Sequence, residues 1–255
     1  MVRRNRNFGW IPDLPDHRDY AFATPLRVAA ALPKKVDLRA KCPPVVNQGN
    51  LGSCTANAIA NAHLYEQMKQ AIAVRFLPSR LFIYYNERAI EGTINSDSGA
   101  MIRDGIKSVA KQGACPEKLW PYVISRFARK PSAAAVKEAL KHQALSYLRI
   151  AQNVALMKGC LASGFPFVFG FTVYESFESK AVAKSGVVPM PASGEGVVGG
   201  HAVLATGYDD AKQRFIVMNS WGAGWGMKGY FTIPYAYLTN PDLSADFWTI
   251  RLVEV

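Results

Sequence analysis

The chain has 255 residues, of which 49% are hydrophobic and 19% charged, and this composition excludes a wholly disordered protein. The 30 Lys and Arg residues outnumber the 19 Asp and Glu residues, and the net charge of +11 would by itself suit binding to nucleic acid or to a membrane surface. The 4 cysteines are too few for a disulfide scaffold, and no stretch has the roughly 18 uninterrupted apolar residues that a membrane span needs.

Residues 1 to 34, called here the N-terminal arm, are rich in Pro, Arg and Asp, with isolated aromatic residues. The pattern predicts an extended segment with one short helix near Leu26 to Leu32. Trp10 and Phe22 favour an arm docked on the body over a frayed terminus. Because no apolar run of signal-peptide length follows the first residues, we expect no Sec signal; a cytoplasmic location and export by a non-Sec route both stay open.

Helices are predicted in the first half of the chain. From Ser53 onward apolar residues recur at helical spacing, and Ser53 can cap the N-terminus of this helix. His63 lies on the apolar face and is expected to be a satisfied core histidine. The other predicted helices cover Ser79 to Ile90, Met101 to Lys111 and Ser132 to His142.

After Leu145 the pattern changes to β-strands punctuated by Gly and Pro. A mostly helical half followed by a mostly β half predicts an α+β fold in two lobes. The predicted strands are Tyr147 to Ile150, Phe165 to Val173, His201 to Tyr208, Arg214 to Asn219, Tyr230 to Ile233 and Phe247 to Val253.

Three separate segments carry residues suited to nucleophilic catalysis. Cys54 stands at a predicted helix start, where backbone N–H groups and the helix dipole favour the thiolate, which is the nucleophilic form. His201 opens a predicted strand, so we expect its imidazole at a lobe surface. Asn219 ends another strand and could orient the His201 ring. Gln48 could donate a side-chain N–H beside the Cys54 backbone N–H, and the two donors would form an oxyanion hole.

These residues resemble the papain-like cysteine peptidases, in which the His and Asn follow the Cys by roughly 130–150 residues. Here His201 follows Cys54 by 147 residues, and Asn219 follows it by 165, slightly beyond that range, which loop insertions would explain. The most specific match is the run N-S-W-G-x-x-W-G-x-x-G-Y-F, which begins at Asn219. The resemblance covers residues 35 to 255. It implies that Gln48 is the oxyanion donor, Cys54 the nucleophile, His201 the acid and base, Asn219 the orienting residue and Trp221 the shield of their hydrogen bond.

The sequence departs from the family pattern near the nucleophile. Leu51 stands where the family usually has a cysteine, so the usual disulfide beside the nucleophile is missing, and Thr55 stands where the family has an aromatic residue. The glycine pair that binds the substrate backbone appears as Ser98-Gly99. By the resemblance, the substrate-binding residues are Ser98, Gly99, Gly200 and Trp221.

The resemblance implies a papain-like fold with a helical left lobe, about residues 35–145, and a β-barrel-like right lobe, about residues 146–255, with the active-site cleft between them. It implies a monomeric cysteine endopeptidase that hydrolyses proteins or peptides through a thiolate–imidazolium pair and an acyl-enzyme thioester. The short N-terminal arm, residues 1–34, is expected to cover the cleft and inhibit the enzyme intramolecularly. We expect no cofactor and no metal.

Two other functions are compatible with these residues. The chain could be a catalytically weak papain-fold binding protein, as Thr55 and the altered glycine pair suggest, or an amide hydrolase or acyl transferase acting on a non-peptide substrate. The basic residues are scattered, from Arg3, Arg4 and Arg6 onward, and form no nucleic-acid-binding motif. Cys42, Cys115 and Cys160 are expected to be bystanders, with pairing of Cys42 and Cys115 left open.

Overall fold

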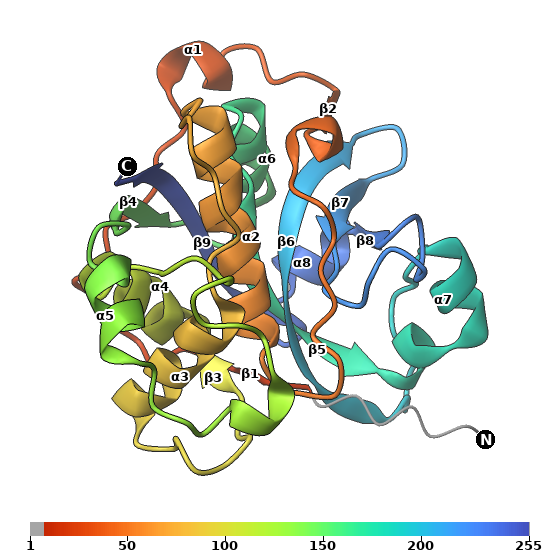
Figure 1. The fold of residues 1–255 in the computed structure, drawn as a ribbon. Coiled ribbons are helices and arrows are strands. Elements are labelled where there is room, and N and C mark those ends of the chain that lie inside the picture. Colours follow the sequence, from red (N-terminus) through yellow and green to blue (C-terminus); the bar gives the residue numbers. More distant parts are fainter. Residues whose placement is uncertain (1–7, 255) are drawn as a thin grey trace.

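The computed structural model describes residues 8–254, so the basic start of the chain with Arg3, Arg4 and Arg6 lies outside the described part. A group of helices packs against one side of a twisted sheet, and further short helices lie at the other edges of the sheet (Figure 1). This arrangement confirms the α+β class expected from the sequence.

The predicted helices of the first half are present. Ser79 and Ser132 cap α3 and α5 by accepting backbone N–H bonds, as their positions suggest. Ser53 precedes α2 but its side chain makes no capping bond; its Oγ instead pairs with the Tyr122 hydroxyl at 2.6 Å, so this predicted cap is wrong. The helices are α2 (Cys54–Lys69), α3 (Arg80–Glu91), α4 (Ile102–Lys111) and α5 (Ala133–Ala139).

The main sheet has the strand order β4-β9-β5-β6-β7-β8, and β2 pairs with β6. All the strands predicted after Leu145 are present, although β6 begins at Val197 and not at His201. It begins earlier because β5 pairs with it in the antiparallel sense as far as Gly199 and Val197. The strands are β2 (Lys35–Asp37), β4 (Ala144–Arg149), β5 (Phe167–Tyr174), β6 (Val197–Asp209), β7 (Arg214–Met218), β8 (Tyr230–Pro234) and β9 (Ser244–Val253).

The remaining helices are short, and most of them were not predicted. The predicted helix of the arm is confirmed as α1. The strand expected from Phe165 is preceded by α6, whose N-terminus Asn153 caps by accepting the N–H groups of Ala155 and Leu156. These elements are α1 (Leu26–Ala29), α6 (Val154–Ala162), α7 (Lys180–Ser185), α8 (Tyr235–Thr239) and the 3-10 turns Arg39–Lys41, Ile124–Arg126 and Glu175–Glu178.

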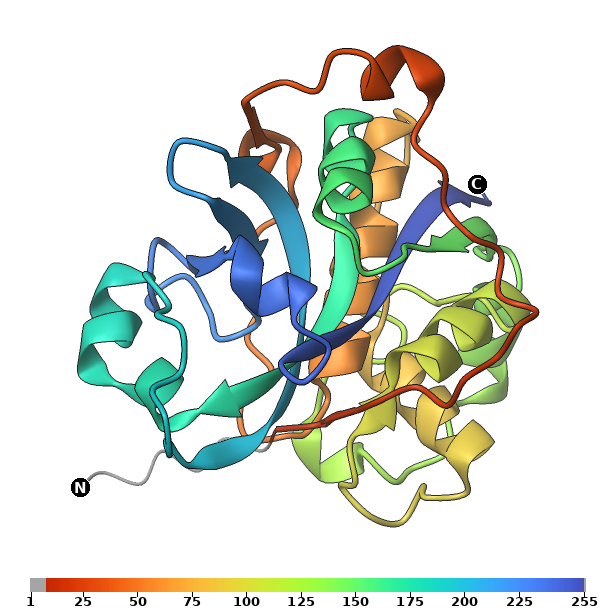
Figure 2. The same ribbon diagram turned by 180° about the vertical axis from the view of Figure 1, so that it is seen from behind.

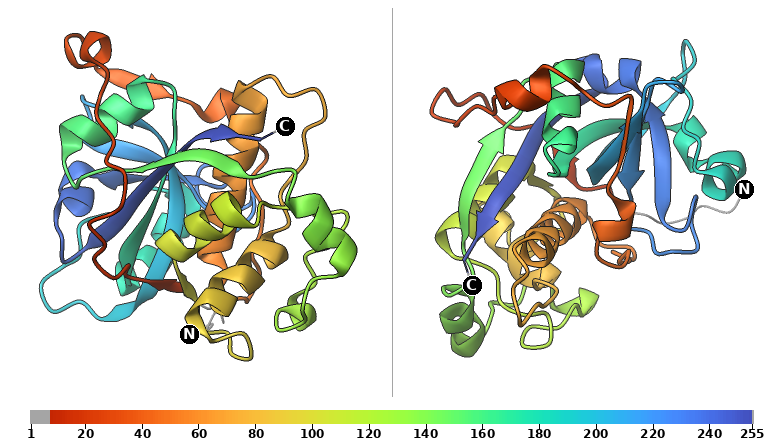
Figure 3. Two further views of the ribbon diagram at one scale, coloured as in Figure 1. Left: turned by 90° about the vertical axis from the view of Figure 1, so that its left-hand side faces the viewer. Right: turned by 90° about the horizontal axis from the view of Figure 1, so that it is seen from above.

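Helix α2 lies between the other helices and the sheet (Figure 3). Every residue from Cys54 to Gln67 is buried, because α3 and α4 cover one side of the helix and β5, β6 and β9 cover the other. Because the helix is covered on all sides, its polar residues, such as Asn57, Asn61 and His63, are buried as well as its apolar ones. This central position brings the first residue of α2 against β6.

The N-terminal arm crosses the molecule before the helical part begins. Strand β1 (Trp10–Ile11) pairs in the parallel sense with β3 (Ala100–Met101), and the arm then follows the back of the molecule to α1 (Figure 2). Phe22 is buried, and the backbone of Arg149 hydrogen-bonds to residues on both sides of Ala21. Over residues 8–254, no helix is long and apolar enough to cross a lipid bilayer.

Candidate active site

Cys54 is the first residue of α2 and its side chain is fully buried. Burial raises the pKa of the Cys54 thiol to about 12, and hydrogen bonds to its sulfur from the backbone of Ala202, Gly9 and Thr55 offset this only in part. The sequence led us to expect a thiolate. In this structure the loss of water around the sulfur outweighs the N–H groups and the helix dipole, and Gly9 of the arm contributes to that covering.

His201 and Asn219 form the hydrogen bond that their predicted roles require. Nε2 of His201 lies 2.8 Å from Oδ1 of Asn219, and the Trp221 ring stacks on the imidazole with centroids 5.0 Å apart and planes at 25°. Asn219 directly follows β7. His201 is fully buried within β6, which corrects the expectation that it would open a strand at a lobe surface. Phe8 of the arm lies edge-on to the ring and helps to cover it.

Gln48 links the loop before α2 to the segment after β7. Its backbone N–H donates to the Ser220 carbonyl at 2.8 Å, and its side-chain Oε1 accepts from the Ser220 hydroxyl at 2.5 Å. Its Nε2 donates to the Leu51 carbonyl at 3.0 Å. Because Ser220 follows Asn219, these bonds hold the predicted oxyanion donor at a fixed position relative to the His201–Asn219 pair.

Two of the predicted substrate-binding residues, Gly99 and Gly200, lie under the arm, whereas Ser98 is exposed. The Ala100 N–H donates to the Gly9 carbonyl at 2.7 Å, and a Cβ atom on Gly99 would come within 2.3 Å of that carbonyl oxygen. A Cβ atom on Gly200 would lie 2.5 Å from the Trp10 carbonyl oxygen. The Ser98 hydroxyl donates to Thr93 and to the Gly99 carbonyl. The backbone of the arm therefore occupies the surface that these glycines leave open.

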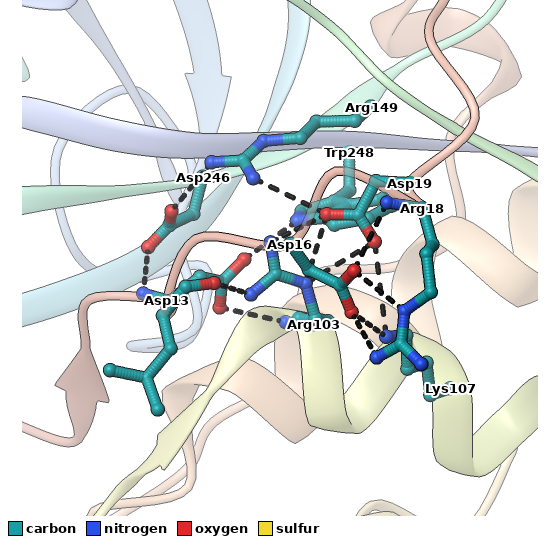
Figure 4. Close-up of polar contacts among 10 residues, drawn as sticks. Asp13, Asp16, Arg18, Asp19, Arg103, Lys107, Arg149, Asp246 and Trp248 are labelled. Carbon is teal, nitrogen blue, oxygen red and sulfur yellow. Dashed lines mark hydrogen bonds and ion pairs between the residues drawn. The ribbon is translucent and has the colours of Figure 1, made fainter.

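The arm is anchored on the far side of this crossing by ion pairs (Figure 4). Asp19 pairs with Arg103 of α4 at 2.5 Å and with Arg149 of β4 at 3.3 Å. The Asp19 and Arg103 side chains are 5% and 6% exposed, so water screens this pair little. Asp16 pairs with Lys107 of α4 at 3.2 Å, and Arg103 also donates to the Leu14 carbonyl.

A second set of contacts joins the arm to β9. Asp13 accepts from the Trp248 indole N–H at 2.9 Å and from the Arg103 backbone N–H at 2.9 Å. Asp246 accepts from the Trp10 indole N–H at 3.1 Å and from the Asp13 backbone N–H at 2.8 Å. Burial, reinforced by the neighbouring Asp246 carboxylate, raises the pKa of Asp13 to about 6. The arm is thus held by matched groups on three elements of the body.

Other residues around the nucleophile carry no sequence motif and were not predicted. Thr55 donates its hydroxyl proton to Glu87 at 2.8 Å, and Asp97 accepts hydrogen bonds from the Gly52 N–H and the Tyr84 hydroxyl. The side chains of Tyr84, Glu87 and Asp97 come close to this region only in the folded chain. The one signal in the sequence is indirect: the departures from the family pattern at Leu51 and Thr55 lie next to them.

All 4 cysteines are free, so the pairing of Cys42 with Cys115 that the sequence left open does not occur. The predicted core histidine, His63, is buried; it lies within hydrogen-bond distance of the His142 carbonyl and of Gln67, and burial lowers its pKa to about 4. Among residues 8–254, no group of three His, Cys, Asp or Glu side chains could hold a metal ion.

Comparison with known proteins gives concordant matches. Residues 32–240 match the family model of papain family cysteine proteases. The chain is 46% identical to xylellain, a cysteine protease from Xylella fastidiosa, whose crystal structure superposes with a TM-score of 0.91 over 98% of each chain. It is 43% identical to an uncharacterized peptidase C1-like protein of Acanthamoeba polyphaga mimivirus, over 98% of this chain and 88% of that one. Procathepsin L 3 of Tenebrio molitor shares the fold, with a TM-score of 0.74 over 97% of this chain and 76% of that one, at 17% identity.

Proposed function

The chain belongs to the papain family of cysteine proteases, and from this premise we propose that it is an endopeptidase in which Cys54 is the nucleophile and His201 the acid and base. Asn219 orients His201, and Gln48 stabilises the oxyanion. The observation that carries this proposal is the 2.8 Å bond between His201 and Asn219, next to the Ala202 N–H that reaches the Cys54 sulfur.

The first half of the reaction forms a thioester. Cys54 gives its proton to Nδ1 of His201, and the sulfur attacks the scissile carbonyl carbon. As the tetrahedral intermediate collapses, the C–N bond breaks and the leaving amine takes the proton from His201. Asn219 holds the ring throughout, because its Oδ1 accepts from the Nε2 N–H, and the stacked Trp221 keeps water from this bond.

The second half hydrolyses the thioester. His201 removes a proton from a water molecule, which attacks the acyl carbon, and the C–S bond breaks to release the carboxylic acid and restore Cys54. In both halves the carbonyl oxygen carries negative charge in the transition state. We assign its stabilisation to Gln48 Nε2 and the Cys54 backbone N–H, each of which should contribute about 10²–10³ in rate.

The N-terminal arm, residues 1–34, acts in this proposal as an intramolecular inhibitor of the peptidase unit formed by residues 35–255. Gly9 and Trp10 lie against Gly99 and Gly200, where a substrate backbone would bind, and the covered Cys54 is a neutral thiol. Hydrolysis therefore requires the arm to move away from the cleft. The match to the family beginning at residue 32 supports a boundary near this point.

Substitution of Cys54 tests the proposed nucleophile, with a peptide blocked at both ends as substrate so that only internal cleavage is detected. Cys54→Ala should lower kcat/KM at least about 10³-fold, and Asn219→Ala by about 10²–10⁴-fold. Cys42→Ala, which removes a free cysteine of another part of the chain, should leave kcat/KM within about twofold. Hydrolysis that survives in Cys54→Ala would overturn the assignment.

A further inference from the structure

The peptide unit between Leu51 and Gly52 is held at both ends by side chains. Its carbonyl oxygen accepts from Nε2 of Gln48 at 3.0 Å. Its N–H, which belongs to Gly52, donates to the two carboxylate oxygens of Asp97 at 3.0 and 3.1 Å. The proposed oxyanion donor, Gln48, and Asp97 therefore form hydrogen bonds to opposite sides of one rigid peptide plane. This plane lies two residues before Cys54.

A tyrosine hydroxyl continues the chain of hydrogen bonds from Asp97. Tyr84 of α3 is fully buried, and its hydroxyl donates to Asp97 at 2.5 Å. The same hydroxyl accepts from the backbone N–H of Gly99 at 3.2 Å. One continuous path thus runs from Gln48 through the Leu51–Gly52 peptide, Asp97 and Tyr84 to Gly99.

The residues along this path are closely packed. A Cβ atom on Gly52 would lie 2.9 Å from Oδ1 of Asp97 and 3.5 Å from the Tyr84 hydroxyl, so only glycine lets the loop approach so closely. The guanidinium of Arg88 lies over the face of the Tyr84 ring, 4.0 Å from its centre, and restricts its movement. Burial and the Asp97 carboxylate raise the pKa of Tyr84, so its hydroxyl keeps the proton that it donates.

No covalent link replaces the disulfide that the family pattern leads one to expect at Leu51, since all 4 cysteines are free. We propose that Asp97 and Tyr84 are positioning residues that hold the oxyanion donor Gln48 and the substrate-binding Gly99 in fixed relation, in place of a disulfide. This inference rests on the proposed function, because it gives these two residues a role only if Gln48 stabilises the oxyanion.

If Asp97 and Tyr84 have this positioning role, their substitution should impair only the reactions that use the oxyanion hole. A peptide aldehyde adds the Cys54 sulfur to its carbonyl carbon, and the carbonyl oxygen, which takes up the thiol proton, then lies in the oxyanion hole. Alkylation of Cys54 by iodoacetamide, which displaces iodide, needs no oxyanion hole. A Gln48 side chain that is no longer held in place should therefore weaken binding of the aldehyde and slow peptide hydrolysis, while the rate of alkylation stays unchanged.

The test compares three variants of the full chain with one control variant. Tyr84→Phe and Asp97→Ala should each lower kcat for the blocked peptide and raise the inhibition constant of the aldehyde by about 10-fold or more, with the alkylation rate within about twofold. Asp97→Asn, which keeps one acceptor oxygen for Gly52, should fall between Asp97→Ala and the wild type. Tyr85→Phe removes the hydroxyl of the next residue of α3 and serves as the control, with wild-type behaviour in every assay.

The outcomes separate this inference from the proposed function. If the wild type neither hydrolyses the peptide nor binds the aldehyde, the proposed function fails. If the wild type does both, and Tyr84→Phe and Asp97→Ala match Tyr85→Phe, the positioning role is wrong. The role is equally wrong if aldehyde affinity and alkylation fall together in both variants and in Asp97→Asn, because that result signals a general loss of structure.

Discussion

A buried carboxyl group lies directly behind the nucleophile. The hydroxyl of Thr55, the residue that follows Cys54, donates a hydrogen bond to Oε2 of Glu87 at 2.8 Å. Burial raises the pKa of Glu87 well above its ordinary value, and Glu91 adds to the rise. An ionised Glu87 would further raise the pKa of the Cys54 thiol. A protonated Glu87 therefore favours ionisation of the Cys54 thiol once the arm has moved.

Glu87 gives folding a pH dependence that can be measured. The folded chain keeps a proton on Glu87 that the unfolded chain releases above its ordinary pKa of about 4.5. The stability contribution is therefore complete below that pH and is lost as pH rises through the folded-state pKa. Glu87→Gln removes the titration but keeps an acceptor for Thr55. Relative to wild type, its free energy of unfolding should improve as pH rises above about 4.5, at up to about 1.4 kcal/mol per pH unit.

Urea unfolding at several pH values measures this difference. Glu175→Gln, at an exposed position, is the control and should show a constant offset from wild type over the same range. A constant offset for Glu87→Gln as well would mean that Glu87 is ionised in the folded protein.

Residue patterns could predict the groups to which we assign the chemistry, but not those that support them. Cys54, His201 and Asn219 lie in segments with distinctive neighbours, such as the glycines before His201 and the Ser-Trp-Gly that follows Asn219. Tyr84 and Asp97 have no such context. Their hydrogen bonds join a helix and two loops, and that meeting depends on the packing of α3 against the loop before α2.

At the scale of elements, the helices and strands with clear periodicity were predicted and the exceptions have physical causes. The strand β6 is longer than predicted because β5 continues the pairing through Gly199 and Gly200, which have little intrinsic strand preference. Helix α6 was not predicted because its sequence is apolar at most positions and shows no clear helical alternation of apolar and polar residues. The course of the arm depends on pairing with β3, which no local pattern shows.

The arm lies close against the body because glycines leave room for it. Besides Gly99 and Gly200, Gly170 of β5 lies under the Trp10 indole, and a Cβ atom there would come within 2.0 Å of the ring. Trp10 also donates its indole N–H to Asp246 at 3.1 Å. Trp10 is therefore the side chain on which the docking of the arm should depend most strongly.

Substitution of Trp10 tests this dependence in the full chain. Trp10→Ala should raise the alkylation rate of Cys54 by iodoacetamide about 10-fold, because the loss of a partly buried aromatic side chain and of its hydrogen bond to Asp246 weakens docking by about 1.4 kcal/mol. Gly170→Ala should act in the same direction by displacing the indole, and the double variant should gain little more than Trp10→Ala alone. Tyr20→Ala is the control, since this arm aromatic is 74% exposed. Wild-type alkylation rates in both Trp10→Ala and Gly170→Ala would show that the arm does not cover Cys54.

At the scale of the whole molecule, composition alone was a poor guide to function. The net charge of +11 suggested nucleic acid, yet Arg103, Lys107 and Arg149 form ion pairs with two aspartates of the arm, Asp16 and Asp19. The family and the fold were instead predicted from three short segments far apart in the sequence. The structure and the matches to known proteins confirm both the family and the fold. The central helix α2 explains why these segments meet, because it joins the helical side of the molecule to the sheet that bears His201.

The most direct test of the account is to map the product formed with a thiol-trapping epoxide while peptide hydrolysis is followed. The epoxide opens when a thiolate attacks its carbon, and it leaves a thioether that mass spectrometry can locate among the 4 cysteines. We predict one equivalent on Cys54, with activity lost in proportion to the adduct. Full modification of Cys54 without loss of hydrolysis, or loss of hydrolysis that follows modification of another cysteine, would contradict the account.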